Sequence, residues 1–167
     1  MSFMDRMVKN LSSFAPRFKK RRFDPEAISI EDINLPLVLM KIDINKIRSM
    51  VEDEVKTYFS LGYKNSSIDQ LKQIEFHSFQ VGVLLRYIKE NRVLRIYNLE
   101  DLLPTFILKA TKKQLHIKVF GIVYRYDKSV PKTKTEDQLM DDIRWSPLEV
   151  GYLLRYIDME NRQITKS

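Results

Sequence analysis

Hydrophobic residues recur at intervals of three and four over several stretches of the chain, the spacing that places side chains on one face of a helix. Residues 44–58 follow this pattern and are predicted to form a helix. Residues 106–109 and 115–126 are rich in Ile, Val, Phe and Tyr and alternate with polar positions, so they are predicted to be strands, as are residues 93–97. The pattern therefore predicts a small α+β protein.

Two segments of the chain repeat one hydrophobic pattern. Residues 69–71 and 137–139 both read Asp-Gln-Leu, and the eight-residue blocks 81–88 and 150–157 agree in type at seven positions. The two blocks lie 69 residues apart, and chance alone is a poor explanation for a match of this length. We call the two segments copy one and copy two. Two copies make a tandem pair and not a solenoid.

Each copy is predicted to contain a short helix, a tight turn and a longer helix. Ser146 and Glu149 have the spacing of a capping box at the start of the longer helix in copy two. Ser78 is the corresponding cap candidate in copy one. Gly82 and Gly151 fall inside these longer helices, where glycine costs about 1 kcal/mol relative to alanine. They are predicted to allow a close approach to a neighbouring helix or strand.

The Asp-Gln-Leu helix, the turn closed by an aromatic residue, the Ser-capped second helix and the strand after it resemble the helix-turn-helix core of winged-helix domains. The resemblance covers residues 44–127 for copy one and 135–167 for copy two. It implies that the last helix of the core can enter a groove and that a following hairpin forms a wing. Copy two has no predicted first helix and only a stub of a wing, so completion by copy one or by a second subunit is expected. The predicted architecture is thus tandem helix-turn-helix repeats, the first one winged, with a small antiparallel sheet between the copies.

The chain carries 29 Lys and Arg against 22 Asp and Glu, a formal charge of +7 in 167 residues. Residues 1–24 hold seven of these cations and two acids, so their net charge is +5 and the remainder is nearly neutral. We expect three parts: a basic arm at 1–24, a winged-helix-like domain at 25–127 and a second helix-turn-helix repeat at 128–167. The second repeat begins in a segment, 127–135, that is predicted to be an exposed linker because it holds a proline and alternating Lys and Thr.

The basic arm has three open interpretations. Its apolar residues between positions 3 and 14 form one stripe of a short amphipathic helix, and the basic run 17–22 follows Pro16. Such a helix beside a polybasic patch is typical of binding to an anionic membrane. A flexible basic arm can instead follow phosphates. The third interpretation is a terminal helix that packs on the body or on a partner subunit, with the basic run as a solvated linker.

Enzymatic function is the weaker class for this sequence. The two histidines, His77 and His116, fall in different predicted elements, and the chain has no Cys and no Gly-rich phosphate loop. Acidic runs such as 52–54 are predicted to be solvated faces and not metal sites. We therefore expect neither a catalytic residue, nor a cofactor, nor a metal.

Nucleic-acid binding, with duplex DNA as the first choice, is the predicted function. Phosphate contacts are expected from the arm, and helix 78–90 is expected to dock in a major groove, where Gln80 and Arg86 have side chains able to read base edges. The alternative for Arg86, and for Arg155 in copy two, is an ion pair with a neighbouring acid. The full predicted set of nucleic-acid contacts is Arg17, Lys19, Lys20, Arg21, Arg22, Gln80, Arg86, Arg95, Lys109, Lys112 and Lys113.

The outer surface of the longer helix in copy two differs from that in copy one. Leu148, Tyr152 and Tyr156 are predicted to contact protein, so a homo-oligomer or another partner is expected through residues 135–167. The resemblance implies a transcription regulator or a replication-initiator-like factor. The alternative is a winged-helix adaptor or matrix-like scaffold that sits on anionic membranes through its N-terminal helix.

The location of the protein is predicted from missing signals. The chain holds no apolar run near the roughly 18 to 20 residues that cross a bilayer, and no secretory signal pattern is visible. An intracellular location, cytoplasmic or associated with the nucleoid or nucleus, is therefore expected. A mitochondrial presequence at 1–22 stays open as an alternative.

Overall fold

The structure is a computed structural model that describes residues 33–90 and 99–166, with side chains described as far as Glu160. It is mostly helical and contains one two-stranded sheet. The elements of the first half are α3 (Leu37–Met40), α4 (Ile44–Ser60), the 3-10 helix η3 (Tyr63–Asn65), α5 (Ile68–Leu71), β1 (Phe76–His77) and α6 (Ser78–Lys89). Those of the second half are α7 (Leu99–Leu102), α8 (Thr105–Leu108), α9 (Lys112–Ser129), α10 (Glu136–Asp141), β2 (Arg144–Trp145) and α11 (Pro147–Lys166).

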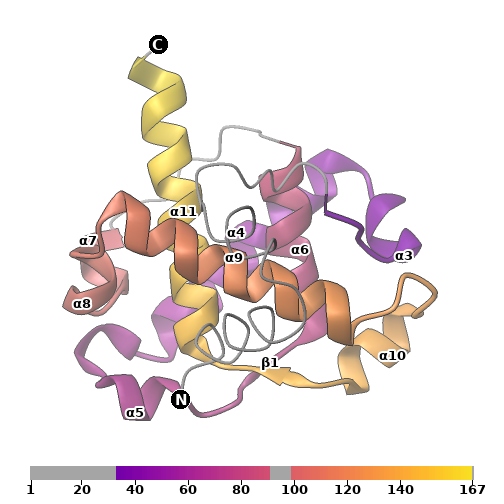
Figure 1. The fold of residues 1–167 in the computed structure, drawn as a ribbon, viewed down its shortest axis with the longest axis horizontal. Helices are drawn as coiled ribbons and strands as arrows, with labels where there is room; N and C mark the ends of the chain where they lie inside the picture. The colour runs from indigo at the N-terminus through magenta and orange to yellow at the C-terminus, as the bar shows by residue number, and fades with distance from the viewer. Residues whose placement is uncertain (1–32, 91–98, 167) are drawn as a thin grey trace, which may run out of the picture.

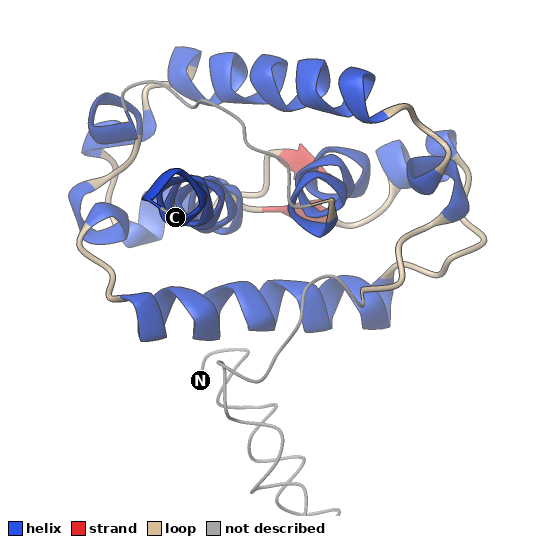
Figure 2. Cartoon of the chain, turned by 90° about the horizontal axis from the view of Figure 1, so that it is seen from above, coloured by secondary structure: helices blue, strands red, loops and turns tan. Residues whose placement is uncertain are grey.

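The two long helices α4 and α9 lie on opposite sides of the molecule, and α6 and α11 fill the space between them (Figure 2). Helices α3 and α10 lie at one end of this arrangement, while α5, α7 and α8 lie at the other end (Figure 1). One hydrophobic core runs through both halves, from Ile33 to Ile157. Helices α6 and α11 form the middle layer of that core.

The same order of elements occurs twice along the chain. Proline precedes the short first helix in both halves, at Pro36 before α3 and at Pro104 before α8. A long helix, a short helix with a capping box, a two-residue strand and another helix then follow in each half. Up to the short capped helix, equivalent residues lie 68 positions apart, as Tyr58 and Tyr126 do, and from the strands onward they lie 69 apart.

One small antiparallel sheet is present, as the α+β prediction requires, but it is not formed by the predicted strands. Strand β1 pairs with β2 in antiparallel register, with Phe76 opposite Trp145. These two residues hold equivalent positions in the repeated sequence pattern, one in each copy. The predicted helix at 44–58 is confirmed, as α4.

The predicted strands at 106–109 and 115–126 are wrong, because both segments are helical as α8 and α9. The side chain of Thr111 begins α9 by accepting a hydrogen bond from the Gln114 backbone N–H, and the Gln114 side chain accepts one in return. Apart from Gly121, the buried residues of α9 then recur at steps of four, three and four, which is a helical face. They are Leu115, Val119, Gly121, Ile122 and Tyr126.

Two further predictions about helix starts have different outcomes. Ser146 and Glu149 form the expected capping box, since each backbone N–H donates to the side chain of the other residue. Ser78 is not the cap of α6, because His77 takes that role and its Nδ1 accepts from the Gln80 backbone N–H at 3.3 Å. Burial and the nearby Arg144 charge lower the pKa of His77, which favours the neutral ring that this cap requires.

The predicted boundary at residue 127 falls inside α9. Helix α9 precedes α10 and α11, where no helix was predicted for copy two. The expected arm at 1–24 and the strand at 93–97 lie outside the described residues.

Each copy contributes a tyrosine to the middle helix of the other copy. The Tyr58 hydroxyl donates to the Pro147 carbonyl at 3.3 Å, and the Tyr126 hydroxyl donates to the Ser78 carbonyl at 3.2 Å. A Cβ added to Gly151 would lie 2.8 Å from the Tyr58 hydroxyl, and one added to Gly82 would lie 2.4 Å from the Tyr126 hydroxyl. The predicted close approach at both glycines is therefore confirmed, and it joins the two copies.

Candidate nucleic-acid interface

Helix α6, the predicted groove-reading helix, lies in the interior. Nine of its twelve residues are buried. Phe79 is 7% exposed, and Val83 and Tyr87 are 1% exposed each. The prediction that this helix presents a free face to a groove is wrong, because α6 packs against α4, α3, α10 and α11.

Arg86 and Gln80 are engaged inside the protein and do not face a groove. The Nη2 of the buried Arg86 donates to the Met40 and Ile42 carbonyls at 3.4 and 3.3 Å, and the Arg86 Nη1 lies 3.1 Å from Glu90 Oε1. The Gln80 Oε1 accepts from the His77 backbone N–H, which completes the cap of α6. The ion-pair alternative for Arg86 is thus confirmed, and base reading by Arg86 and Gln80 does not agree with these contacts.

The predicted contacts of the arm and the wing cannot be placed. Arg17, Lys19, Lys20, Arg21, Arg22 and Arg95 lie outside the described residues. Lys109, Lys112 and Lys113 are described and exposed, but none lies on a strand or a wing. Lys109 is the C-cap of α8, and the other two lie in the first turn of α9.

Helix α9 carries most of the excess basic charge in the described part of the chain. It contains five cations and the acid Asp127, a net charge of +4 without His116. Helix α4, its equivalent in copy one, contains three cations and three acids. The two helices occupy equivalent places on opposite sides of the molecule (Figure 2), so the difference in charge is a difference between the two faces.

We define the α9 face as Lys112, Lys113, Phe120, Tyr124 and Lys128. Its three lysines are exposed and its two aromatic residues are half-buried. The ring centroids of Phe120 and Tyr124 are 6.3 Å apart, and Lys128 Nζ lies 5.6 Å from the Tyr124 centroid. Lysines beside aromatic rings form the kind of surface that contacts phosphates and bases together.

The α9 face could have been found in the sequence. Phe120, Tyr124 and Lys128 were missed because their segment was interpreted as a strand, in which alternate residues face opposite sides. With helical spacing, Phe120, Tyr124 and Lys128 share one side of the helix.

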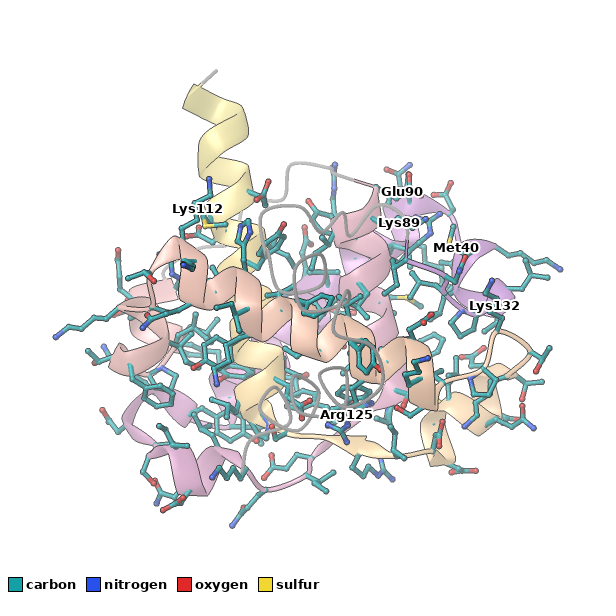
Figure 3. The ribbon with its side chains drawn as sticks, in the orientation of Figure 1. Met40, Lys89, Glu90, Lys112, Arg125 and Lys132 are labelled. Atoms are coloured by element: carbon teal, nitrogen blue, oxygen red, sulfur yellow. The ribbon has the colours of Figure 1, made fainter. Side chains whose placement is uncertain are left out.

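Another cation of α9, Arg125, has a structural role at the junction of the copies. Its Nη1 lies 2.7 Å from Glu149 Oε2, its Nη2 donates to the Arg144 carbonyl, and its guanidinium lies 4.2 Å from the centre of the Trp145 ring (Figure 3). These contacts hold α9 to β2 and α11. We therefore leave Arg125 out of the α9 face.

The predicted protein-contact residues of α11 make their described contacts within the chain. Leu148, Tyr152 and Tyr156 are half-buried. Lys118 Nζ lies 5.9 Å from the Tyr152 centroid, and the rings of Tyr156 and His116 are 5.5 Å apart. Burial raises the pKa of Tyr152. These side chains serve to pack α11 against α9.

A buried acid on α4 gives a prediction about pH. Burial, with a smaller effect of Asp53, raises the pKa of Glu54, and neither carboxyl oxygen has a hydrogen-bond partner. Because the folded pKa exceeds the unfolded one, stability should fall as pH rises from the unfolded pKa to the folded pKa and should then level off. Ile122 occupies the equivalent position in α9.

We expect Glu54→Ile to raise the free energy of unfolding by about 1–3 kcal/mol near pH 8, the range for relieving a buried unsatisfied polar group. Glu54→Gln should lose its difference from wild type near pH 4, where the acid is largely protonated in both states. Urea unfolding at both pH values measures these differences. Glu52→Gln, an exposed change on the same helix, is the control, and a pH-independent Glu54→Gln difference would contradict the prediction.

Within the described residues, no cluster of three or more His, Cys, Asp or Glu side chains is arranged to hold a metal ion. In the same part of the chain, no helix has the length and apolar character required to cross a bilayer. No protein-family model, curated protein or solved structure matches this chain.

Proposed function

We propose that this protein is a non-enzymatic nucleic-acid-binding protein that contacts phosphates through the α9 face and through the basic residues of its N-terminal arm. The observation that carries the proposal is the net charge of +4 on α9 where the equivalent helix α4 is neutral. The two helices hold equivalent places in the fold, so packing requirements alone do not explain this difference.

The contacts of the α9 face favour backbone binding over base reading. Exposed lysines supply sequence-independent attraction to phosphates, with a strong dependence on salt. On α6, the two side chains that could read base edges are Gln80 and Arg86, and both already make hydrogen bonds within the protein. Binding is therefore expected to discriminate weakly between sequences.

We further propose that each copy is a helix-turn-helix unit: α4, α5 and α6 in copy one, and α9, α10 and α11 in copy two. In this arrangement the third helices of the two units pack together in the core. The helix that enters a groove in winged-helix proteins would then hold the two units together. A first helix, α9, would provide the nucleic-acid surface.

The test uses two double variants with equal changes of charge. Lys112→Ala with Lys113→Ala removes two exposed cations from α9, and Lys46→Ala with Lys56→Ala removes two exposed cations from α4. Each phosphate contact contributes roughly one unit to the slope of log K against log salt. We expect the α9 variant to lower the magnitude of this slope by about 2 and the α4 variant to leave it unchanged.

Fluorescence anisotropy with duplex DNA and single-stranded RNA over a salt series measures these slopes. An equal decrease of the slope in the two variants would show that only net charge matters, and would contradict the assignment of phosphate contacts to the α9 face. Absence of nucleic-acid binding at low salt, together with binding to anionic vesicles, would favour the membrane scaffold and would overturn the proposal.

A further inference from the structure

Copy one has a group of exposed apolar side chains where α4 ends and α5 begins. Phe59 is 61% exposed, Leu61 47%, Ile68 48% and Ile74 59%. We call these four residues the apolar corner. Single exposed apolar residues are ordinary on protein surfaces, but several along one short stretch of chain mark an interaction surface.

Comparison of the two copies shows that the fold does not require apolar residues at three of these four places. Equivalent positions here lie 68 residues apart, with buried Tyr58 and Tyr126 on one side and buried Leu71 and Leu139 on the other. The pairs of equivalent residues are Phe59 with Asp127, Leu61 with Ser129, and Ile68 with Glu136. The fourth corner residue, Ile74, corresponds to the apolar Ile143. At the other three positions copy two forms the same helices with polar residues, so the apolar character there has a cause outside the internal packing.

The charges around the corner indicate its partner. Lys56, Lys64 and Lys72 are exposed, and so are Asp69, Glu75 and Asp101. Lys64 Nζ lies 3.6 Å from Asp101 Oδ1, and Lys72 Nζ lies 3.8 Å from Asp69 Oδ1. A strongly acidic or strongly basic partner would meet like charges on this rim. A second copy of the same rim brings both signs and can place opposite charges together across a two-fold axis.

We propose that the apolar corner is the interface of a symmetric homodimer of this chain. The same patch on each subunit would cover the other, as in an isologous interface. This surface belongs to copy one and differs from the oligomer surface predicted at residues 135–167. The corner lies at the end of α4, and α9 lies on the opposite side of the molecule from α4 (Figure 2), so a dimer through the corner does not require α9 to be covered.

The first test is the mass of the full chain in solution by light scattering after size-exclusion chromatography. One chain has a mass of 19.9 kDa, and we expect twice that value for the wild type. Chain concentrations up to about 0.1 mM populate a dimer with a micromolar Kd. A wild type that is monomeric over this whole range would overturn the proposal.

The decisive variant gives copy one the residues that copy two has. Phe59→Asp with Ile68→Glu should yield a monomer with the helical circular dichroism of the wild type. Leu61→Ser with Phe59→Ser is a milder version in case the added acids impair folding. Leu37→Thr is the matched control, because Leu37 is 59% exposed away from the corner and Thr105 is its equivalent in copy two. The control should stay dimeric, and a dimer that survives both corner variants would show that another surface holds it.

The absence of cysteine from the chain allows an independent check. Single cysteines placed by Phe59→Cys, Leu61→Cys and Ile68→Cys should be joined between chains by a short bis-maleimide, whereas Leu37→Cys should not. Equal cross-linking at all four positions would indicate random collision and would contradict the interface. None of these measurements involves nucleic acid, so their failure is distinguishable from failure of the α9 proposal.

Discussion

Gly82→Ala is expected to lower the free energy of unfolding by about 1–4 kcal/mol, although alanine is the better helix former. The new Cβ would lie 2.3 Å from Leu39 Cδ1 and 2.4 Å from the Tyr126 hydroxyl, both of them in the buried core. Relief of the overlap requires Tyr126 to move away from the Ser78 carbonyl, so the buried hydrogen bond between the copies is lost. The gain of about 1 kcal/mol in helix propensity offsets only part of this cost.

Urea unfolding followed by circular dichroism measures the loss. Gly151→Ala is the matched variant, and its smaller overlaps of 2.8 and 2.9 Å predict a smaller loss. In a double-mutant cycle, Tyr126→Phe removes the hydroxyl that the new Cβ would meet, so the two changes together should cost less than their sum. A Gly82→Ala protein that is more stable than wild type would show that Gly82 has no close neighbour.

The helices with one apolar face were predictable from the sequence. In α4 the buried positions Ile47, Val51, Glu54 and Tyr58 keep the spacing of three and four, and the exposed positions between them are mostly charged. Two-residue strands carry little periodic signal of their own. The strands at 76–77 and 144–145 were therefore not predicted from the sequence.

Helix α9 was assigned to the wrong class because its composition competes with its periodicity. Ile117, Val119 and Val123 are β-branched, and Phe120 and Tyr124 are aromatic, which favours a strand in local propensity. Burial of the face from Leu115 to Tyr126 against α11 overrides that preference. The capping sequence that begins at Thr111 was the local signal that favoured a helix.

The direction in which α6 faces could not be decided from one stripe of apolar residues. All seven residues from Val81 to Tyr87 are buried, because α4 covers one side of the helix and the second copy covers another. The sequence did hold a warning: a helix with apolar residues on every side is an interior helix. Arg86 made the helix look exposed, because the sequence does not distinguish a buried arginine that donates to carbonyls from an arginine on the surface.

For the candidate site, the exposure of single residues could be predicted from the sequence, whereas their arrangement depended on the tertiary fold. The exposure of Lys112 and Lys113 was predictable because lysine is hydrophilic. Their position on a helix was not predicted, because the segment that follows them was assigned as a strand. The contrast between α9 and α4 depends on knowing that these helices are equivalent. That knowledge came from the repeated order of elements in the fold.

Trp145→Ala is expected to cost about 3–5 kcal/mol, the largest effect of any single substitution considered for this chain. Trp145 is fully buried, pairs with Phe76 across the sheet, and carries the Arg125 guanidinium on its ring. Its Nε1 donates to Ser78 Oγ at 3.0 Å, and Ser78 Oγ in turn donates to the Ile143 carbonyl at 3.3 Å. One side chain therefore joins the sheet, the first residue of α6 and the start of α11.

Smaller changes separate the packing of Trp145 from its hydrogen bond. Trp145→Phe keeps an aromatic ring and loses the Nε1 donor, so it should cost less than Trp145→Ala. Ser78→Ala leaves the buried Nε1 without an acceptor, at a cost of about 1–3 kcal/mol. Once Trp145→Phe has removed the donor, Ser78→Ala should cost less, which a double-mutant cycle detects.

The measurement is thermal and urea unfolding by circular dichroism, since Trp145 is the single tryptophan of the chain and its removal abolishes the fluorescence signal. Domains of this size have a total stability of roughly 5–15 kcal/mol, so Trp145→Ala should remove a large share of it. If Trp145→Ala costs no more than an exposed substitution such as Leu37→Thr, the junction between the copies contributes little to stability. The two halves would then unfold in separate transitions, whereas a shared core requires that they unfold together.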